Sequence, residues 1–115
     1  MMEFGKRIRE LRKGKQWTLR DLSKRVGVGF TYLSKIENDK LEDGHHASEQ
    51  LIRKLAVELG GDEDELLLLA EKVPEPIRRR VIERPEVFRL LAELRDEELN
   101  DLAHRASRIQ RQRNS

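Results

Sequence analysis

The side chains of this sequence that could do chemistry are mostly cations, and they gather at its N-terminal end. Residues 1–40 hold 11 Lys/Arg against 5 Asp/Glu, a net charge of +6, although the 115-residue chain carries only +2. Residues 41–75 hold 3 basic and 10 acidic residues, and residues 76–115 hold 10 and 7. A concentrated basic region is what binding to the phosphates of a nucleic acid requires. We therefore expect a basic binding surface within residues 1–40, with the acidic middle facing away from it.

The sequence contains no arrangement of residues that is typical of a catalytic or metal centre. There is no cysteine, hence no thiol nucleophile, thiolate metal site or disulfide framework. There is no His-Glu-x-x-His pattern, no glycine-rich phosphate loop and no pair of acidic residues suited to acid–base catalysis. His45 and His46 are adjacent, which is unsuited to binding one metal ion, and Asp43-Gly44 beside them predicts a turn. We expect no enzyme activity, no metal and no cofactor.

Composition also bears on the cellular compartment. The chain begins MMEFGKRIRE, which is charged and lacks the apolar region of a secretion signal. Its longest apolar run, at residues 66–70, is far shorter than the ~18 residues that span a membrane. We expect a cytoplasmic protein with no membrane partner.

The elements that would position the basic residues are two short helices within residues 18–40. Thr18 is a predicted N-cap, and Asp21 three residues later predicts a capping box. Gly27 stands where the end of a helix needs a residue that tolerates a positive φ. A second helix is predicted over residues 30–38, with one side facing inward and the other free to meet a partner.

This pattern resembles the helix-turn-helix of the lambda-repressor and Cro-like family, also called the xenobiotic-response-element family. Two helices crossing on a short turn need a small contact residue and a left-handed turn residue. The resemblance covers residues 4–70 and implies an ion pair between Arg12 and Glu37. The family's small, glycine and apolar positions are matched by Ser23, Gly27, Leu22, Val26, Val28, Leu33 and Ile36. An ordinary αα-hairpin in a helical bundle remains the alternative.

The resemblance implies a sequence-specific transcriptional regulator that binds double-stranded DNA as a homodimeric repressor. The second helix of the pair would enter the major groove and contact base edges through Phe30, Thr31 and Lys35. Lys35 can donate to guanine O6 or N7, and Phe30 can touch a thymine methyl group. The other positions that the resemblance assigns to the DNA-binding surface are Thr18, Arg20, Gly29, Tyr32, Ser34, Asn38 and Lys40. Binding to RNA remains an alternative, although the sequence lacks an aromatic stacking platform.

Three residues depart from the family pattern. Leu19 replaces a common glutamine that bonds a phosphate, so that bond is absent and we expect Leu19 to pack on Phe30. Gly29 replaces the usual Ser or Thr cap and is a weaker cap. Asp39 replaces a glycine after the second helix, and Asp can also adopt the left-handed conformation. These changes affect the phosphate contacts and leave the fold intact.

Further signals predict an all-α, five-helix lambda-repressor-like DNA-binding domain over residues 1–72. A first helix is expected over residues 3–13, and Trp17 is expected to fill the core between the first two helices. Ser48 predicts the cap of a fourth helix. Asp62 with Glu65 predicts a capping box that opens a fifth helix, ending at Ala70.

Residues 73–115 are predicted to form a small helical region that mediates dimerisation. Pro76 is placed to begin a helix, Arg84-Pro85 interrupts the chain, and Asp96 is a predicted cap of a final helix to about Arg111. The apolar positions of the last helix recur at 3, 4, 3, as in a heptad, but for fewer than two heptads. Such a region buries little by itself. The predicted dimer contacts are Val87, Leu91, Leu94, Leu99, Leu102 and Ile109.

A second function, a protein-interaction module, remains open. The resemblance allows an antitoxin that masks a toxin, or a regulator that a partner metallopeptidase cleaves. A gel shift with DNA from upstream of the coding sequence would separate these two classes.

Overall fold

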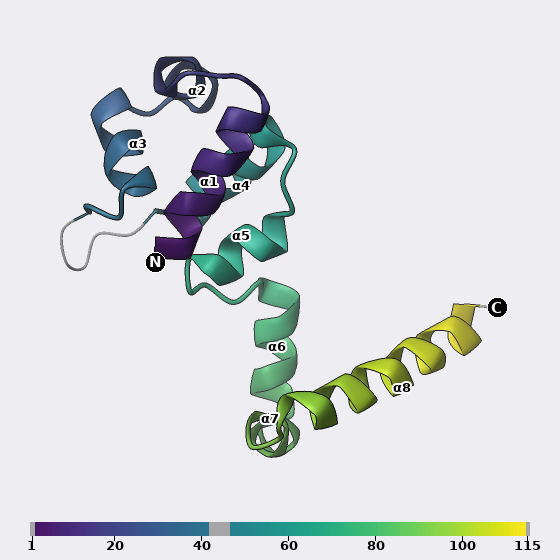
Figure 1. Cartoon of the computed structure of the whole chain (residues 1–115). Helices are drawn as coiled ribbons and strands as arrows, with labels where there is room; N and C mark the ends of the chain where they lie inside the picture. Colours follow the sequence, from purple (N-terminus) through teal and green to yellow (C-terminus); the bar gives the residue numbers. More distant parts are fainter. Residues whose placement is uncertain (1, 42–46, 115) are drawn as a thin grey trace. The chain divides into compact units, whose positions relative to one another are not determined.

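The fold consists of helices alone over the part of the chain that the computed structural model describes, residues 2–41 and 47–114 (Figure 1). The expected turn at Asp43-Gly44 and the His45-His46 pair lie outside these residues. The helices are α1 (Met2–Gly14), α2 (Leu19–Val26), α3 (Phe30–Glu37), α4 (Glu49–Leu59), α5 (Glu63–Leu69), α6 (Glu75–Glu83), α7 (Pro85–Ala92) and α8 (Asp96–Asn114). The predicted all-α fold class is confirmed.

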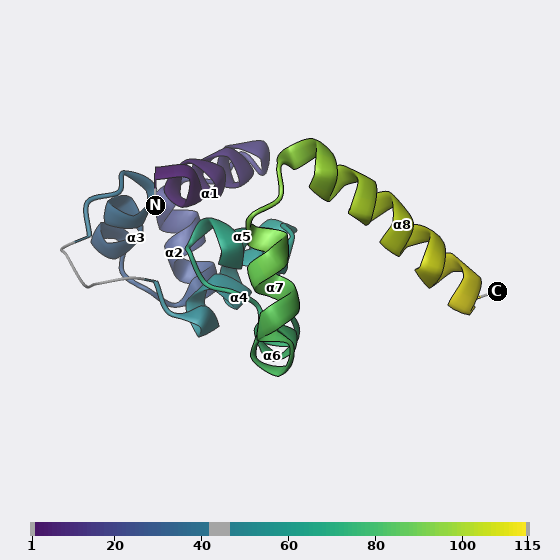
Figure 2. The ribbon, with the colours of Figure 1, turned by 90° about the horizontal axis from the view of Figure 1, so that it is seen from below.

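The helices form two compact units, Met1–Pro74 and Glu75–Ser115. In the first, α1 packs against α3, α4 and α5, while α2 packs against α3 and α4 (Figures 1 and 2). Among the residues that the structure describes, fifteen apolar ones are buried between these five helices. They are Phe4, Ile8, Leu22, Val26, Leu33, Ile36, Ala47, Leu51, Ile52, Leu55, Ala56, Leu59, Leu66, Leu67 and Ala70.

Helix ends in the first unit follow the local sequence. Ser48 Oγ accepts from the N–H of Leu51 at 3.1 Å, and Asp62 Oδ1 accepts from the N–H of Glu65 at 3.1 Å. Both predicted caps are therefore confirmed. The Glu65 carboxylate, however, accepts from Arg7 Nε at 2.8 Å. A capping box was expected at this position, and the structure instead has an α1–α5 ion pair.

Gly5 allows α1 to lie unusually close to the end of α3. A Cβ atom at this position would stand 2.3 Å from the carbonyl oxygen of Ile36 and 2.9 Å from that of Glu37. Both neighbours are backbone atoms, which cannot rotate away as a side chain can. This contact sets the distance between α1 and α3, and the sequence patterns above gave no sign of it.

The second unit has helices but no buried residue in any of them. Within it α6 packs against α7, and Pro85 occupies the first position of α7. Two predicted helix starts need correction. Helix α6 begins one residue before Pro76, and Asp96 is the first helical residue of α8, where Arg95 N–H donates to Glu98 Oε1 at 3.0 Å.

Among the described residues, no helix has the length and apolar character to cross a membrane.

Candidate nucleic-acid interface

The turn between α2 and α3 is fixed by hydrogen bonds from residues at both ends of α2. Thr18 N–H donates to Asp21 Oδ2 at 2.8 Å, and Asp21 N–H donates to Thr18 Oγ1 at 3.1 Å, which confirms the predicted capping box. The hydrogen bond from the Thr18 backbone holds the pKa of the Asp21 carboxyl below its usual value. At the other end Gly27 has φ +73°, the predicted left-handed conformation, and the Ser23 hydroxyl donates to the carbonyl of Val28.

Helix α3 has one buried and one exposed side. Leu33, Ile36 and Glu37 are buried. Phe30, Thr31 and Lys35 are exposed, and the Phe30 residue retains 42% of its accessible surface. As predicted, Gly29 caps the helix without a side-chain hydrogen bond, and Asp39 adopts a left-handed conformation with φ +54°.

Arg12 and Glu37 form a buried ion pair that anchors α3 to α1. Arg12 Nε lies 2.8 Å from Glu37 Oε2, and Arg12 Nη2 lies 2.9 Å from Glu37 Oε1. Arg12 Nη1 also donates to the Trp17 carbonyl at 2.8 Å, so one guanidinium joins three segments. The side chains are only 11% and 2% exposed. The hydrogen bond to Glu37 raises the pKa of Arg12, which keeps this arginine charged inside the fold. The predicted ion pair is confirmed.

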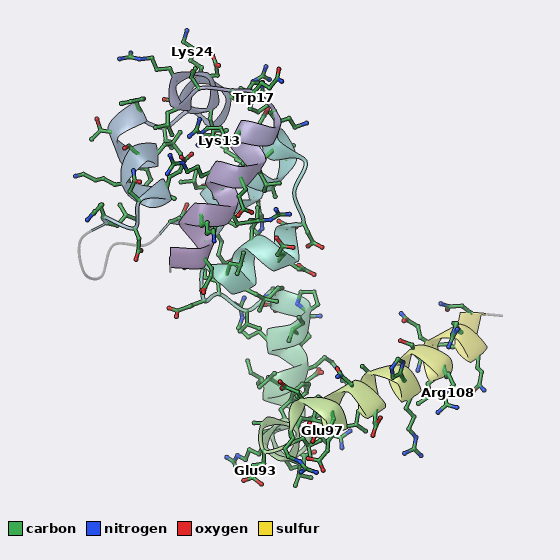
Figure 3. All side chains as sticks on the ribbon, viewed as in Figure 1. Lys13, Trp17, Lys24, Glu93, Glu97 and Arg108 are labelled. Carbon is green, nitrogen blue, oxygen red and sulfur yellow. The ribbon has the colours of Figure 1, made fainter. Side chains whose placement is uncertain are left out.

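Two aromatic rings beside α2 carry arginines on their faces. The guanidinium carbon of Arg20 lies 5.0 Å from the centroid of the Phe30 ring, and that of Arg25 lies 4.0 Å from the centroid of Trp17. These are cation–π distances. Trp17 is half-buried against the core, near the junction of α1 and α2 (Figure 3). Leu19 packs on the core, and Arg20 lies over the Phe30 ring.

The positions that the resemblance assigns to the DNA-binding surface differ in their solvent exposure and hydrogen bonding. Tyr32 and Ser34 are half-buried, and Tyr32 packs against the core. Asn38 Nδ2 donates to the carbonyl of Ser34 at 2.8 Å, which leaves its amide group partly engaged within α3. The exposed positions are Thr18, Arg20, Gly29, Phe30, Thr31, Lys35, Asn38 and Lys40.

The geometry thus presents an exposed side of a short helix, anchored by a buried ion pair and preceded by a tightly capped helix. Residues 5–72 match the family model described as a helix-turn-helix domain. The chain belongs to this family. It is a DNA-binding transcriptional regulator of the helix-turn-helix type.

The fold agrees with a solved structure. A chain of the SinR protein/SinI protein complex superposes with a TM-score of 0.53 and 21% sequence identity, covering 96% of this chain and 98% of that chain. This similarity confirms the lambda-repressor-like fold class. A search of curated proteins finds no match to the sequence.

Proposed function

We propose that this regulator is a repressor that binds its operator as a homodimer and reads the major groove with α3. The observation that carries the proposal is the two-sided character of α3. Leu33 and Ile36 fix the helix on the core, and the opposite side leaves Phe30, Thr31 and Lys35 exposed. A helix presented in this way fits the major groove.

The exposed residues suit different parts of the DNA. Lys35 would donate to a guanine edge, and Phe30, with Arg20 beside its ring, would lie against a thymine methyl group. Thr18, Arg20, Gly29, Asn38 and Lys40 surround this centre and would contact the backbone. Tyr32 and Ser34 would contribute less, because both are half-buried.

The experiment compares Lys35, which we expect to contact a base edge, with Lys40, which we expect to contact the phosphate backbone. Lys35→Ala should weaken operator binding by ~1–3 kcal/mol and relax the preference at one base pair in each half-site. Lys40→Ala should weaken binding to all sequences alike and reduce the salt slope by ~1, because phosphate contacts carry no sequence information. The measurement is binding of both variants to upstream DNA and to scrambled DNA across a salt series. Equal losses on both DNAs for Lys35→Ala would contradict the assignment of α3 as the reading helix.

The second unit supports the homodimer part of the proposal. Leu99 and Leu102 are 38% exposed and Ile109 is 52% exposed, so their apolar surface is available to a partner. The remaining proposed dimer contacts, Val87, Leu91 and Leu94, are half-buried. A dimer would require an operator with two half-sites ~10 bp apart or a multiple of that distance.

A second candidate is binding of a different protein to the same unit. The similar solved structure is a complex of two proteins, SinR and SinI, and exposed apolar helices suit such a contact. A toxin or a metallopeptidase would be a partner of this kind. Sedimentation of the purified chain separates the candidates, because a monomer would favour a different partner and a dimer favours the first proposal.

A further inference from the structure

Helix α8 has a charge distribution that reverses along its length. Residues 96–101 hold Asp96, Glu97, Glu98 and Asp101 and no basic residue. Residues 102–114 hold Arg105, Arg108, Arg111 and Arg113 and no acidic residue. Figure 3 labels one residue of each part, with Glu97 near the start of the helix and Arg108 toward its end.

The helix dipole accounts for only part of this polarity. Acidic residues in the first turn and basic residues in the last turn compensate the partial charges at the helix ends, but the effect fades within one turn. Asp101, Arg105 and Arg108 lie in the middle of the helix. None of the three forms an ion pair with another described residue of the chain. Their placement therefore needs a second explanation.

The mid-helix charges lie on one side of the apolar stripe of α8. In the heptad whose a and d positions are Leu99, Leu102, Ala106 and Ile109, Glu98 and Arg105 occupy g, and Asp101 and Arg108 occupy c. These four form a charged flank along the stripe. The other flank, at e and b, is neutral over the same turns, with Asn100, Ala103, Ser107 and Gln110.

The geometry points to pairing of α8 with α8 of a second copy of this chain, in antiparallel orientation; this inference rests on the proposed homodimer. In an antiparallel pair g faces g, so the two charged flanks meet with their directions reversed. Asp101 then lies level with Arg108 of the second copy, while Arg105 at the centre lies level with its own counterpart. The acidic start of each helix then lies beside the basic end of the other, and the two helix dipoles are opposed. In a parallel pair the charged flank would face the neutral one, and acidic starts would lie together.

Apolar contacts are also satisfied in this orientation. Leu99 can lie opposite Ile109 of the second copy, and Leu102 opposite its Ala106, so each residue of the stripe meets an apolar partner. The stripe alone does not select an orientation, because a parallel pair would stack identical residues. The reversal of charge from the acidic start to the basic end of α8 favours the antiparallel orientation, although Arg105 meets Arg105 at its centre.

Two variants of the full chain test whether the charged flank lies at the interface. Glu98→Arg/Asp101→Arg makes the flank wholly basic, and Arg105→Glu/Arg108→Glu makes it wholly acidic. Each variant should dimerise about ten-fold more weakly or worse by sedimentation, and an equimolar mixture should recover a 1:1 heterodimer. The matched control Asn100→Glu/Ser107→Arg alters the neutral flank and should leave the dimer unchanged. Unimpaired self-association of both flank variants would overturn the inference.

Spin labels test the orientation directly. The sequence has no cysteine, so Asn100→Cys and Asn114→Cys each give a single labelling site away from the stripe. In an antiparallel pair two labels at position 114 should lie further apart than a mixed pair at 100 and 114, by ~20 Å along the helix axis. A parallel pair reverses this order. Circular dichroism checks that each variant retains its helix.

The outcomes separate this inference from the proposed function. The reversed order of distances, or a dimer insensitive to α8, would overturn the antiparallel pairing and leave the homodimer in place. A wild-type chain that stays monomeric at 100 µM would overturn both the pairing and the homodimer. Reading of DNA by α3 is tested separately by Lys35→Ala.

Discussion

Both units of the molecule consist of helices with apolar residues at helical spacing, but they differ in whether those residues are buried. In the N-terminal unit, amphipathic helices bury fifteen apolar residues among themselves. In the C-terminal unit, the helices carry apolar residues at helical spacing, yet none is buried. The exposed large ones are Ile77, Val81, Ile82, Leu90, Leu99, Leu102 and Ile109.

Ion pairs show the same difference at the level of single contacts. Arg12–Glu37 and Arg80–Glu83 both join nitrogen and oxygen at 2.8 Å. The side chains of the first pair are 11% and 2% exposed, whereas those of the second are 62% and 48% exposed. Distance alone therefore does not measure how much an ion pair contributes to stability. Solvent screens the exposed pair, whereas breaking the buried pair would leave a charge without a counter-ion inside the fold. The N-terminal unit has a buried core of its own, and we propose that the C-terminal unit, which buries none of its helical residues, is an interaction element.

Removing the C-terminal unit should produce the largest effect. A chain of residues 1–74 keeps every member of the core, so we expect cooperative thermal unfolding and a monomer. Loss of the second DNA-binding head should lower operator affinity by about a hundred-fold or more. Sedimentation, thermal melting and a gel shift on the same sample measure these outcomes. A truncated chain that still dimerises would show that the two units do not divide these tasks.

The next largest effect should come from breaking the buried ion pair. Glu37→Gln leaves the Arg12 charge without its counter-ion and should lower the free energy of unfolding by ~3 kcal/mol. This corresponds to a fall in Tm of more than about 10 °C for a domain of this size. The control, Glu83→Gln on α6, breaks a pair of equal length and should change stability by less than ~1 kcal/mol. Equal losses of stability in the two variants would show that the buried ion pair contributes no more than the exposed one.

Local signals predicted the caps and the turn well, because a cap depends on residues three or four apart. Thr18, Asp21, Gly27 and Ser48 all behave as their sequence context indicates. Contacts between distant segments were harder to foresee. The Glu65 carboxylate was expected to accept a hydrogen bond at the start of its own helix, but it accepts one from Arg7, 58 residues away. The arginine over Phe30 and the close approach at Gly5 have the same origin, since only the packed arrangement of helices brings these groups together. The Arg12–Glu37 pair was anticipated only because the family resemblance implies it.

The roles of the DNA-contacting residues stay predictions for a different reason. Exposure shows which side chains of α3 are available, and it does not show which base or phosphate each would meet. The orientation of a dimer is likewise absent from the fold of one chain. It has to be inferred from the pattern of charge along α8.

A smaller effect is expected from filling the close contact between α1 and α3. Gly5→Ala places a methyl group against the backbone of Ile36 and Glu37 and should lower stability by ~2 kcal/mol through overpacking. Gly14→Ala in the same helix is the control, because nothing lies within 4 Å of a Cβ there. That variant should be neutral or stabilising by up to ~1 kcal/mol, since alanine is the better helix former. Chemical denaturation of both variants measures the difference. Comparable losses would show that the helices of the N-terminal unit pack less closely than described.

The smallest effect concerns carboxylates that are exposed in both units but held by different partners. The pKa of Asp21 is lowered chiefly by the Thr18 backbone N–H, whereas that of Glu75 is lowered chiefly by the Arg78 side chain. Because each folded-state pKa lies below its unfolded value, each carboxylate stabilises the fold above the unfolded pKa and loses that effect as pH falls through the folded pKa. Salt screens the attraction between exposed charged side chains, while the helix cap keeps its backbone hydrogen bond. Carboxyl-carbon NMR titrations at low and high salt should therefore show the Glu75 pKa returning toward its ordinary value, with that of Asp21 remaining lowered. If salt changed the pKa values of Asp21 and Glu75 by the same amount, the helix cap in the N-terminal unit would be no more resistant to salt than the surface ion pair in the C-terminal unit.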